Sequence, residues 1–140
     1  MDIITNACQA LLGSGLLHWG TDTIYACLYN SGAAFTKDTV AYSATNELAT
    51  NYGYTQKNYA LASKTVTWDD ANDQIMYDCA DLTWTASGGD IGPARYCAMV
   101  HSGESKVLYV IDFVTDKTAN TGTDFKVTID VSGLMRSRQA

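Results

Sequence analysis

The clearest pattern of hydrophobic and polar positions lies in the last third of the chain, where three runs alternate with period two. The runs cover residues 94–100, 107–113 and 125–131, with short polar breaks between them. The apolar residues expected to share a face are Ala94, Tyr96, Ala98 and Val100 in the first run, Val107, Tyr109, Ile111 and Phe113 in the second, and Phe125, Val127, Ile129 and Val131 in the third. Such alternation is typical of strands with one buried face, so the runs predict three consecutive strands of one sheet system.

Further strand signals lie earlier in the chain. Both faces of residues 23–29 are apolar, which predicts a strand covered on both sides. Residues 59–68 and 74–78 predict a hairpin, because the Asp- and Asn-rich segment 69–73 between them favours a chain reversal. A shorter strand is expected at 81–85, which brings the total to about seven or eight strands.

The helical signal is confined to the N-terminus. Residues 3–12 place apolar side chains at helix-face spacing and end at a Gly-Ser-Gly breaker, which predicts a short amphipathic helix. Residues 36–58 are polar and weakly patterned, so we expect a long excursion with at most one turn of helix, at 43–48. Pro93 directly precedes the first of the three C-terminal runs, where its missing N–H costs little.

Many short strands, frequent Gly, Asn, Asp and Ser breaks and a single helix predict an all-β fold. We expect a β-sandwich or jelly roll with a short N-terminal helix. At 140 residues and 46% apolar content the chain fits one domain. Residues 1–140 are therefore expected to form a single β domain, with 1–20 as helix and lead-in and 134–140 as a C-terminal tail.

The formal net charge of -6 is unevenly distributed along the chain. Residues 65–94 contain six Asp and no Lys or Arg, while the acidic and basic residues outside this window cancel. Binding to nucleic acid is not expected, because affinity for phosphate comes from clustered Lys and Arg. The acidic window is either a solvated turn region or a docking surface for a basic partner. Arg136 and Arg138 form a local basic pair near the C-terminus.

The four cysteines, Cys8, Cys27, Cys79 and Cys97, are too far apart in sequence to resemble the ligand pairs of a zinc site. Three disulfide connectivities are open, but Cys27 and Cys97 fall in apolar strand patterns where a free thiol behaves as a small hydrophobe. We expect four reduced thiols in a protein folded in a cytosol. The sequence contains neither a signal-peptide pattern nor an apolar run long enough for a bilayer, so no membrane association is expected.

No arrangement of residues predicts catalysis, a metal site or a cofactor. His18 lies in an apolar patch and His101 at a strand end, where ordinary packed or edge roles are the simpler interpretation. Ser14 lacks the spacing and the preceding strand of a nucleophile elbow. Segment 69–73 lacks the ligand order, the central Gly and the closing Glu of an EF-hand loop. We therefore do not expect an enzyme.

Tyrosine is abundant, with nine residues against three Phe. Several of them, including Tyr52 and Tyr54, are concentrated in or beside the polar excursion 36–58. Tyr is favoured where one end of the ring is buried and the other meets water or a partner, but packing within loops is also common. Tyr52, Tyr54, Arg136 and Arg138 are the candidate partner contacts.

Seven short segments follow one another between residues 20 and 134. They are TDTIYACLYNS (21–31), NYGYT (51–55), VTW (66–68), DLTW (81–84), ARYCAMV (94–100), YVIDF (109–113) and GTDFKV (122–127). In this order and with these gaps, the chain resembles a family of small structural proteins of tailed bacteriophages.

The resemblance implies a virion component, foremost a capsid cement or decoration protein. Such a protein would be made in the host cytoplasm, bind the major capsid protein on the capsid exterior and tie neighbouring capsomers together, commonly as a homotrimer. The alternative is a tail- or fibre-associated virion module that binds glycans through its tyrosines. Neither role requires nucleic acid, a membrane or a cofactor.

Overall fold

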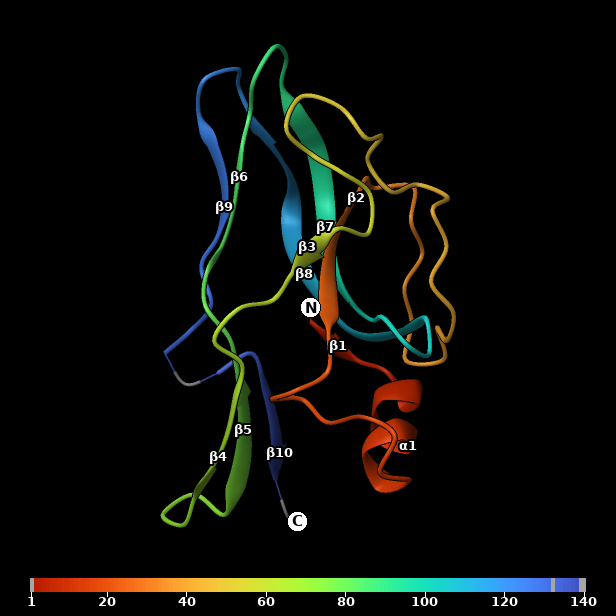
Figure 1. Ribbon diagram of the computed structural model, residues 1–140, viewed down its shortest axis with the longest axis vertical. Helices are drawn as coiled ribbons and strands as arrows, with labels where there is room; N and C mark the ends of the chain where they lie inside the picture. The colour runs from red at the N-terminus through yellow and green to blue at the C-terminus, as the bar shows by residue number, and fades with distance from the viewer. Residues whose placement is uncertain (1, 132, 139–140) are drawn as a thin grey trace.

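The computed structural model describes residues 2–131 and 133–138 and is built around a five-stranded antiparallel sheet. In spatial order its strands are β1 (Ile3–Ile4), β8 (Lys106–Ala119), β7 (Ile91–His101), β2 (Ile24–Tyr29) and β3 (Tyr59–Ala60). The long strands β7 and β8 run through the middle of the molecule (Figure 1). Strands make up 44% of the structure and helix 6%, which confirms the predicted all-β fold with a short N-terminal helix.

Two smaller sheets complete the fold. Strands β6 (Leu82–Thr85) and β9 (Asp124–Val127) form one, and β10 (Met135–Arg138), β5 (Gln74–Asp78) and β4 (Thr65–Asp69) form the other, which we call the arm. In Figure 1 the β6–β9 sheet lies beside the upper part of the large sheet, and the arm extends downward across from α1 (Asn6–Gly13). The predicted hairpin is confirmed for β4 and β5, whereas Tyr59 and Ala60 belong to the large sheet.

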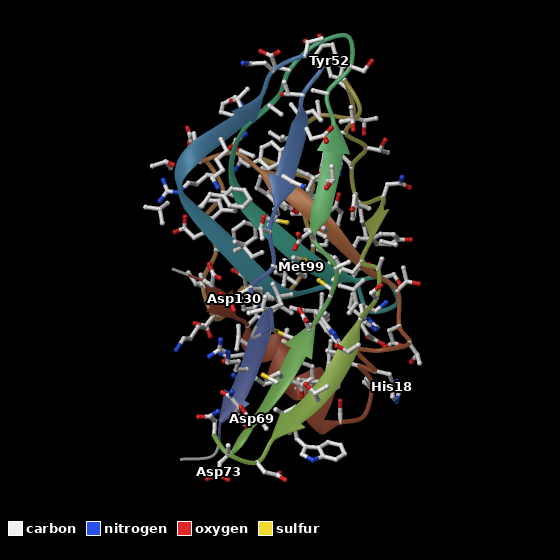
Figure 2. The ribbon with its side chains drawn as sticks, turned by 90° about the vertical axis from the view of Figure 1, so that its left-hand side faces the viewer. His18, Tyr52, Asp69, Asp73, Met99 and Asp130 are labelled. Carbon is white, nitrogen blue, oxygen red and sulfur yellow. The ribbon has the colours of Figure 1, made fainter. Side chains whose placement is uncertain are left out.

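The five-stranded sheet separates two apolar clusters. The larger cluster joins this sheet to β6, β9, α1 and the base of the arm, and its members include Ile24, Leu28, Met99, Trp84 and Phe125. Met99 lies near the centre of the molecule (Figure 2). The smaller cluster covers the opposite face, and its members include Cys27, Val100 and Val110. Alternate residues of β2 enter opposite clusters, so the prediction of a strand buried on both sides is confirmed.

The N-terminal helix begins later than its apolar pattern indicates. Ile3 and Ile4 are strand residues that pair with Val110 and Tyr109 of β8, so the predicted helix at 3–12 is wrong at its start. Thr5 is the N-cap: its hydroxyl oxygen accepts the Cys8 N–H at 3.1 Å. The same hydroxyl donates to a β8 carbonyl, which fixes the start of the helix against the sheet.

Register shifts divide the first C-terminal run between the two faces of the sheet. Ala94 packs in the larger cluster, whereas Tyr96, Ala98 and Val100 pack in or against the smaller one. The pairing of β7 with β8 is irregular between Ala94 and Tyr96, so the prediction that all four share a face is wrong at Ala94. Pro93 lies inside β7, after a cis peptide bond, and not before it as predicted.

The second run is divided in the same way. Val100 pairs with Val107 and Met99 with Tyr109, which leaves Leu108 as an extra residue on β8. Val107 therefore packs in the smaller cluster and Tyr109 in the larger one, contrary to the predicted common face.

The third run keeps its alternation but not its length. Phe125, Val127 and Ile129 are buried, as predicted, although β9 ends at Val127. Val131 is fully exposed, so the run does not continue to 131 as a half-buried strand. Residues 135–138 are a strand of the arm, which corrects the prediction of a C-terminal tail from residue 134.

Candidate functional site

Tyr54, predicted as a partner contact, belongs to the core. Its side chain is 2% exposed, its hydroxyl donates to the Glu47 carboxylate at 2.7 Å, and it accepts the Leu28 N–H at 2.9 Å. Burial and the bond to Glu47 raise the pKa of this hydroxyl far above its usual value. Glu47 also accepts the Tyr42 hydroxyl and the Lys57 N–H. The prediction for Tyr54 is wrong because its ring and hydroxyl hold the excursion against β2.

The excursion is organised by this network and not by regular structure. The predicted helical turn at 43–48 is absent; the segment holds a turn and a single bridge between Glu47 and Tyr29. Further bridges join Ala41 to Lys106 and Asn51 to Tyr54. A buried carboxylate with several donors thus replaces a helix or strand as the organising element.

Tyr52 is an exposed residue at the opposite end of the molecule from the turn of the arm (Figure 2). It occupies a two-residue turn, because Asn51 and Tyr54 exchange backbone hydrogen bonds of 2.9 Å in both directions. Both turn residues have positive φ, 55° at Tyr52 and 97° at Gly53, as type I′ hairpin turns require. The ring packs against Gly89, where an added Cβ would lie 2.5 Å from it. Tyr52 therefore remains a candidate contact.

Arg136 and Arg138 lie on β10 of the arm, where Arg136 is opposite Met76. The Arg136 side chain is exposed, and that of Arg138 lies outside the described residues. Because the arm and Tyr52 occupy opposite ends of the molecule, the structure does not bring the predicted contacts together in one site.

The acidic window is also divided in space. Asp69 and Asp73 lie at the end of the arm, whereas Asp90 lines a small cavity beside Tyr52 at the other end. Asp90 accepts the Thr121 N–H at 2.8 Å, so it serves the local loop. The charges of residues 65–94 therefore do not form one surface.

The most exposed large apolar side chain on a regular element, Trp68, lies on the arm beside two other exposed apolar side chains. Trp68 is 77% exposed, and Val66 and Ile75 are 45% and 42% exposed. Trp68 is opposite Ile75 and Val66 is opposite Tyr77, so the four side chains share one face of the arm. The sequence prediction did not include this surface. A signal for it is present, because the four-residue turn 70–73 sets the register that places Trp68 beside Ile75.

The same face leads into a groove between the arm and the helix. Tyr77 and Met135 of the arm face Ile4, Cys8 and Leu12 across a cavity of about 580 Å³. Trp19 packs edge-on against Tyr77, with ring centroids 5.9 Å apart. The apolar face is thus buried at the base of the arm and exposed toward its turn.

The titratable groups elsewhere serve the fold. His101 is buried; its Nδ1 accepts the Glu104 N–H, so Nε2 carries the proton and donates to Asp22 at 2.8 Å. The backbone N–H of His18 donates to the same carboxylate. This bond and the one from His101 lower the pKa of Asp22. These contacts hold the segment before β2 against the end of β7.

All four cysteines are buried free thiols. Burial raises the pKa of Cys8 and of Cys79 to about 11 and that of Cys27 and Cys97 further. Within the described residues, no group of three or more His, Cys, Asp or Glu is placed to hold a metal ion. Nor does that part of the chain contain a helix with the length and apolarity to cross a membrane.

No protein-family model, curated protein or solved structure matches this chain. The similarity to phage structural proteins therefore stays a prediction from the sequence segments.

Proposed function

We propose that this chain is a bacteriophage virion structural protein, a capsid cement or decoration protein that binds the outer face of an assembled shell. The observation that carries the proposal is the apolar face of the arm, with Trp68 held out on a regular sheet. An exposed apolar patch of this kind marks an interaction surface, and Trp is enriched at interface hot spots. The sequence resemblance supplies the partner, the major capsid protein.

The proposed mechanism needs no catalytic step, metal or cofactor. A protein that binds the assembled shell but not its separated subunits stabilises the shell by RT ln(1 + [L]/Kd) at each occupied site. A homotrimer at a threefold position would repeat the contact and convert modest single-site affinity into avidity. The protein would be made in the host cytoplasm and act on the capsid exterior, without contacting nucleic acid or a membrane.

The alternative, a tail- or fibre-associated module that binds glycans, loses a supporting feature. Among the tyrosines of the excursion and its flank, Tyr54 is buried, Tyr42 and Tyr59 are partly buried, and Tyr52 is exposed. A sugar-stacking surface needs open aromatic rings. A single open ring is a weaker basis for glycan binding than a cluster.

The test compares phage particles assembled with and without this chain. We expect many copies per particle, in a fixed ratio to the major capsid protein, and a higher temperature of shell disruption when the chain is present. Protein quantification and thermal disruption of purified particles measure both quantities. A few copies located at the tail, with equal heat resistance in both preparations, would overturn the cement function in favour of the tail module.

A further inference from the structure

We propose that the arm is the docking surface of this protein, and that its occupant is an extended segment of a partner protein with alternating apolar residues and flanking Lys or Arg. The inference deepens the proposed function and rests on it for the identity of the partner. It is carried by the exposed apolar face, the open edge of β4 and the charge at the turn.

The two faces of the arm differ in polarity. Val66, Trp68, Ile75 and Tyr77 share one face, and the opposite face carries Thr65, Thr67, Asp69, Gln74, Met76 and Asp78. If the exposed part of the arm had no partner, polar residues on both of its faces would keep it soluble. Instead the apolar face continues past the part covered by Trp19 and the helix. A partner would complete the burial that the fold begins.

Strand β4 is an open edge. It is one of the two outer strands in the order β10-β5-β4, and the first four side chains of β4, residues 65–68, are all exposed. Natural edge strands are usually blunted by Lys, Pro or a bulge, yet β4 reads Thr-Val-Thr-Trp-Asp and pairs regularly with β5. An added strand would find backbone partners on this edge, and its apolar side chains would extend the row of Val66 and Trp68.

The negative charge at the turn of the arm favours a partner segment with Lys or Arg. Asp70 and Asp73 are exposed at the turn, and Asp69 ends β4 beside them. The Asn72 amide donates to Asp69 at 2.6 Å and lowers its pKa, so this carboxylate also stays ionised. Two copies meeting at their turns would bring like charges together, whereas Lys or Arg on a partner would be attracted. Arg136 lies on β10, which β5 separates from the open edge of β4.

The first arm of the test measures binding to shells assembled without this chain, by co-sedimentation of the full-length protein. We expect Trp68→Ala to weaken binding about 30-fold, as for an interface hot spot. The double change Asp70→Asn with Asp73→Asn should weaken binding several-fold at low salt, with little effect at high salt, where charges are screened. Val40→Ala, which changes an exposed apolar residue outside the arm (44% exposed), should bind like wild type. Far-UV circular dichroism checks that each variant is folded.

The second arm uses synthetic peptides and does not depend on the shell. One peptide alternates Val with Lys, and its control alternates Val with Glu. Trp19 and Trp84 are buried, so a blue shift of tryptophan emission on binding should come from Trp68 and disappear in Trp68→Phe. We expect the shift with the Lys peptide, reduced by salt, and none with the Glu peptide.

The outcomes separate this inference from the proposed function. If wild type binds shells and the Trp68 and Asp variants bind equally well, another face docks and the inference is overturned. If wild type ignores shells but binds the Lys peptide through Trp68, the cement function fails and the arm remains a docking surface. Failure to bind either probe overturns both. Self-association that Trp68→Ala abolishes would make a second copy the occupant and would also overturn the inference.

Discussion

Glu47 is a buried carboxylate, 6% exposed, that organises the excursion through the side chains around it. It accepts hydrogen bonds from two tyrosine hydroxyls and one backbone N–H. A buried charged or polar group is costly unless it is fully hydrogen-bonded, so each of these donors is needed. The excursion therefore holds its shape with few regular hydrogen-bonded pairs.

Replacing Tyr54 with Phe tests this network. The substitution keeps the ring but removes the bonds to Glu47 and to the Leu28 N–H, and leaves both groups buried. We expect the free energy of unfolding to fall by about 1–3 kcal/mol, measured by urea denaturation. Tyr52→Phe is the matched control and should change stability by less than about 0.5 kcal/mol, because it keeps the ring and removes only the hydroxyl of an exposed residue. Equal effects of the two substitutions would contradict the structural role of Glu47.

Asp112 provides a pH-dependent contribution to stability. Arg95 Nε donates to its carboxylate at 2.8 Å and lowers its pKa below the ordinary value. A depressed carboxyl pKa stabilises the fold above the unfolded-state pKa of about 3.9 and loses that contribution as pH falls below it. We expect stability to drop as the pH is lowered from about 4 toward 2, and Asp112→Asn to flatten this drop.

Urea denaturation at several pH values checks the expectation. Asp116→Asn, at an exposed position on the same strand, is the control and should leave the acid-induced drop nearly intact. An unchanged pH profile in Asp112→Asn would show that other carboxylates, such as Asp22, control acid stability.

At the scale of elements, β8 changes direction through an irregular segment. Asp112 pairs with Tyr96 and Lys117 with Ala94, so β8 has three more residues than β7 in this interval. Bulges of this kind bend a strand and increase its twist. The bend allows Phe113 to reach Phe125 of β9, with ring centroids 5.9 Å apart, and so joins the large sheet to the β6–β9 sheet.

Val114 lies in this segment with φ of 70°, a conformation that is strained for a β-branched residue. Its side chain is 66% exposed, so little packing is lost on replacement. We expect Val114→Asn to raise the free energy of unfolding by about 1 kcal/mol, because Asn tolerates the left-handed region. Thermal or urea denaturation measures the change. Val40→Asn, without a positive φ, should give no gain, and a gain there of equal size would exclude strain relief as the cause.

At the scale of the whole molecule, one apolar cluster crosses all three sheets and the helix. It contains Leu11 of α1, Met99 of β7, Trp84 of β6, Phe125 of β9 and Met135 of β10. The arm, the five-stranded sheet and the β6–β9 sheet share this core, so no part of it can be exposed without weakening the rest.

We therefore predict that the protein unfolds as one cooperative unit. In Trp68→Phe the remaining tryptophans, Trp19 and Trp84, report on the base of the arm and on β6. Their fluorescence and the far-UV circular dichroism should follow the same urea transition. Transitions at clearly different urea concentrations would show that the arm unfolds separately, contrary to the prediction of a single domain.

The sequence by itself determined those strands that can be recognised without knowing how they pair with a neighbouring strand. The double-sided run of β2, the hairpin β4–β5 and the buried alternation of Phe125, Val127 and Ile129 follow from local side-chain patterns and turn residues. The exposed face of the arm was also within reach, because a four-residue turn fixes which side chains lie opposite each other.

Only the tertiary structure decided which apolar residues of the alternating runs share a face of the sheet and which tyrosines are buried. Extra residues in β8 rotate side chains between the two clusters, and a bulge depends on the partner strand, which no local window contains. Tyr54 is buried because Glu47 and Leu28 supply partners from other parts of the chain. Asp69 and Asp73 lie at the opposite end of the molecule from Asp90 for the same reason: proximity in sequence does not set proximity in space across a change of sheet.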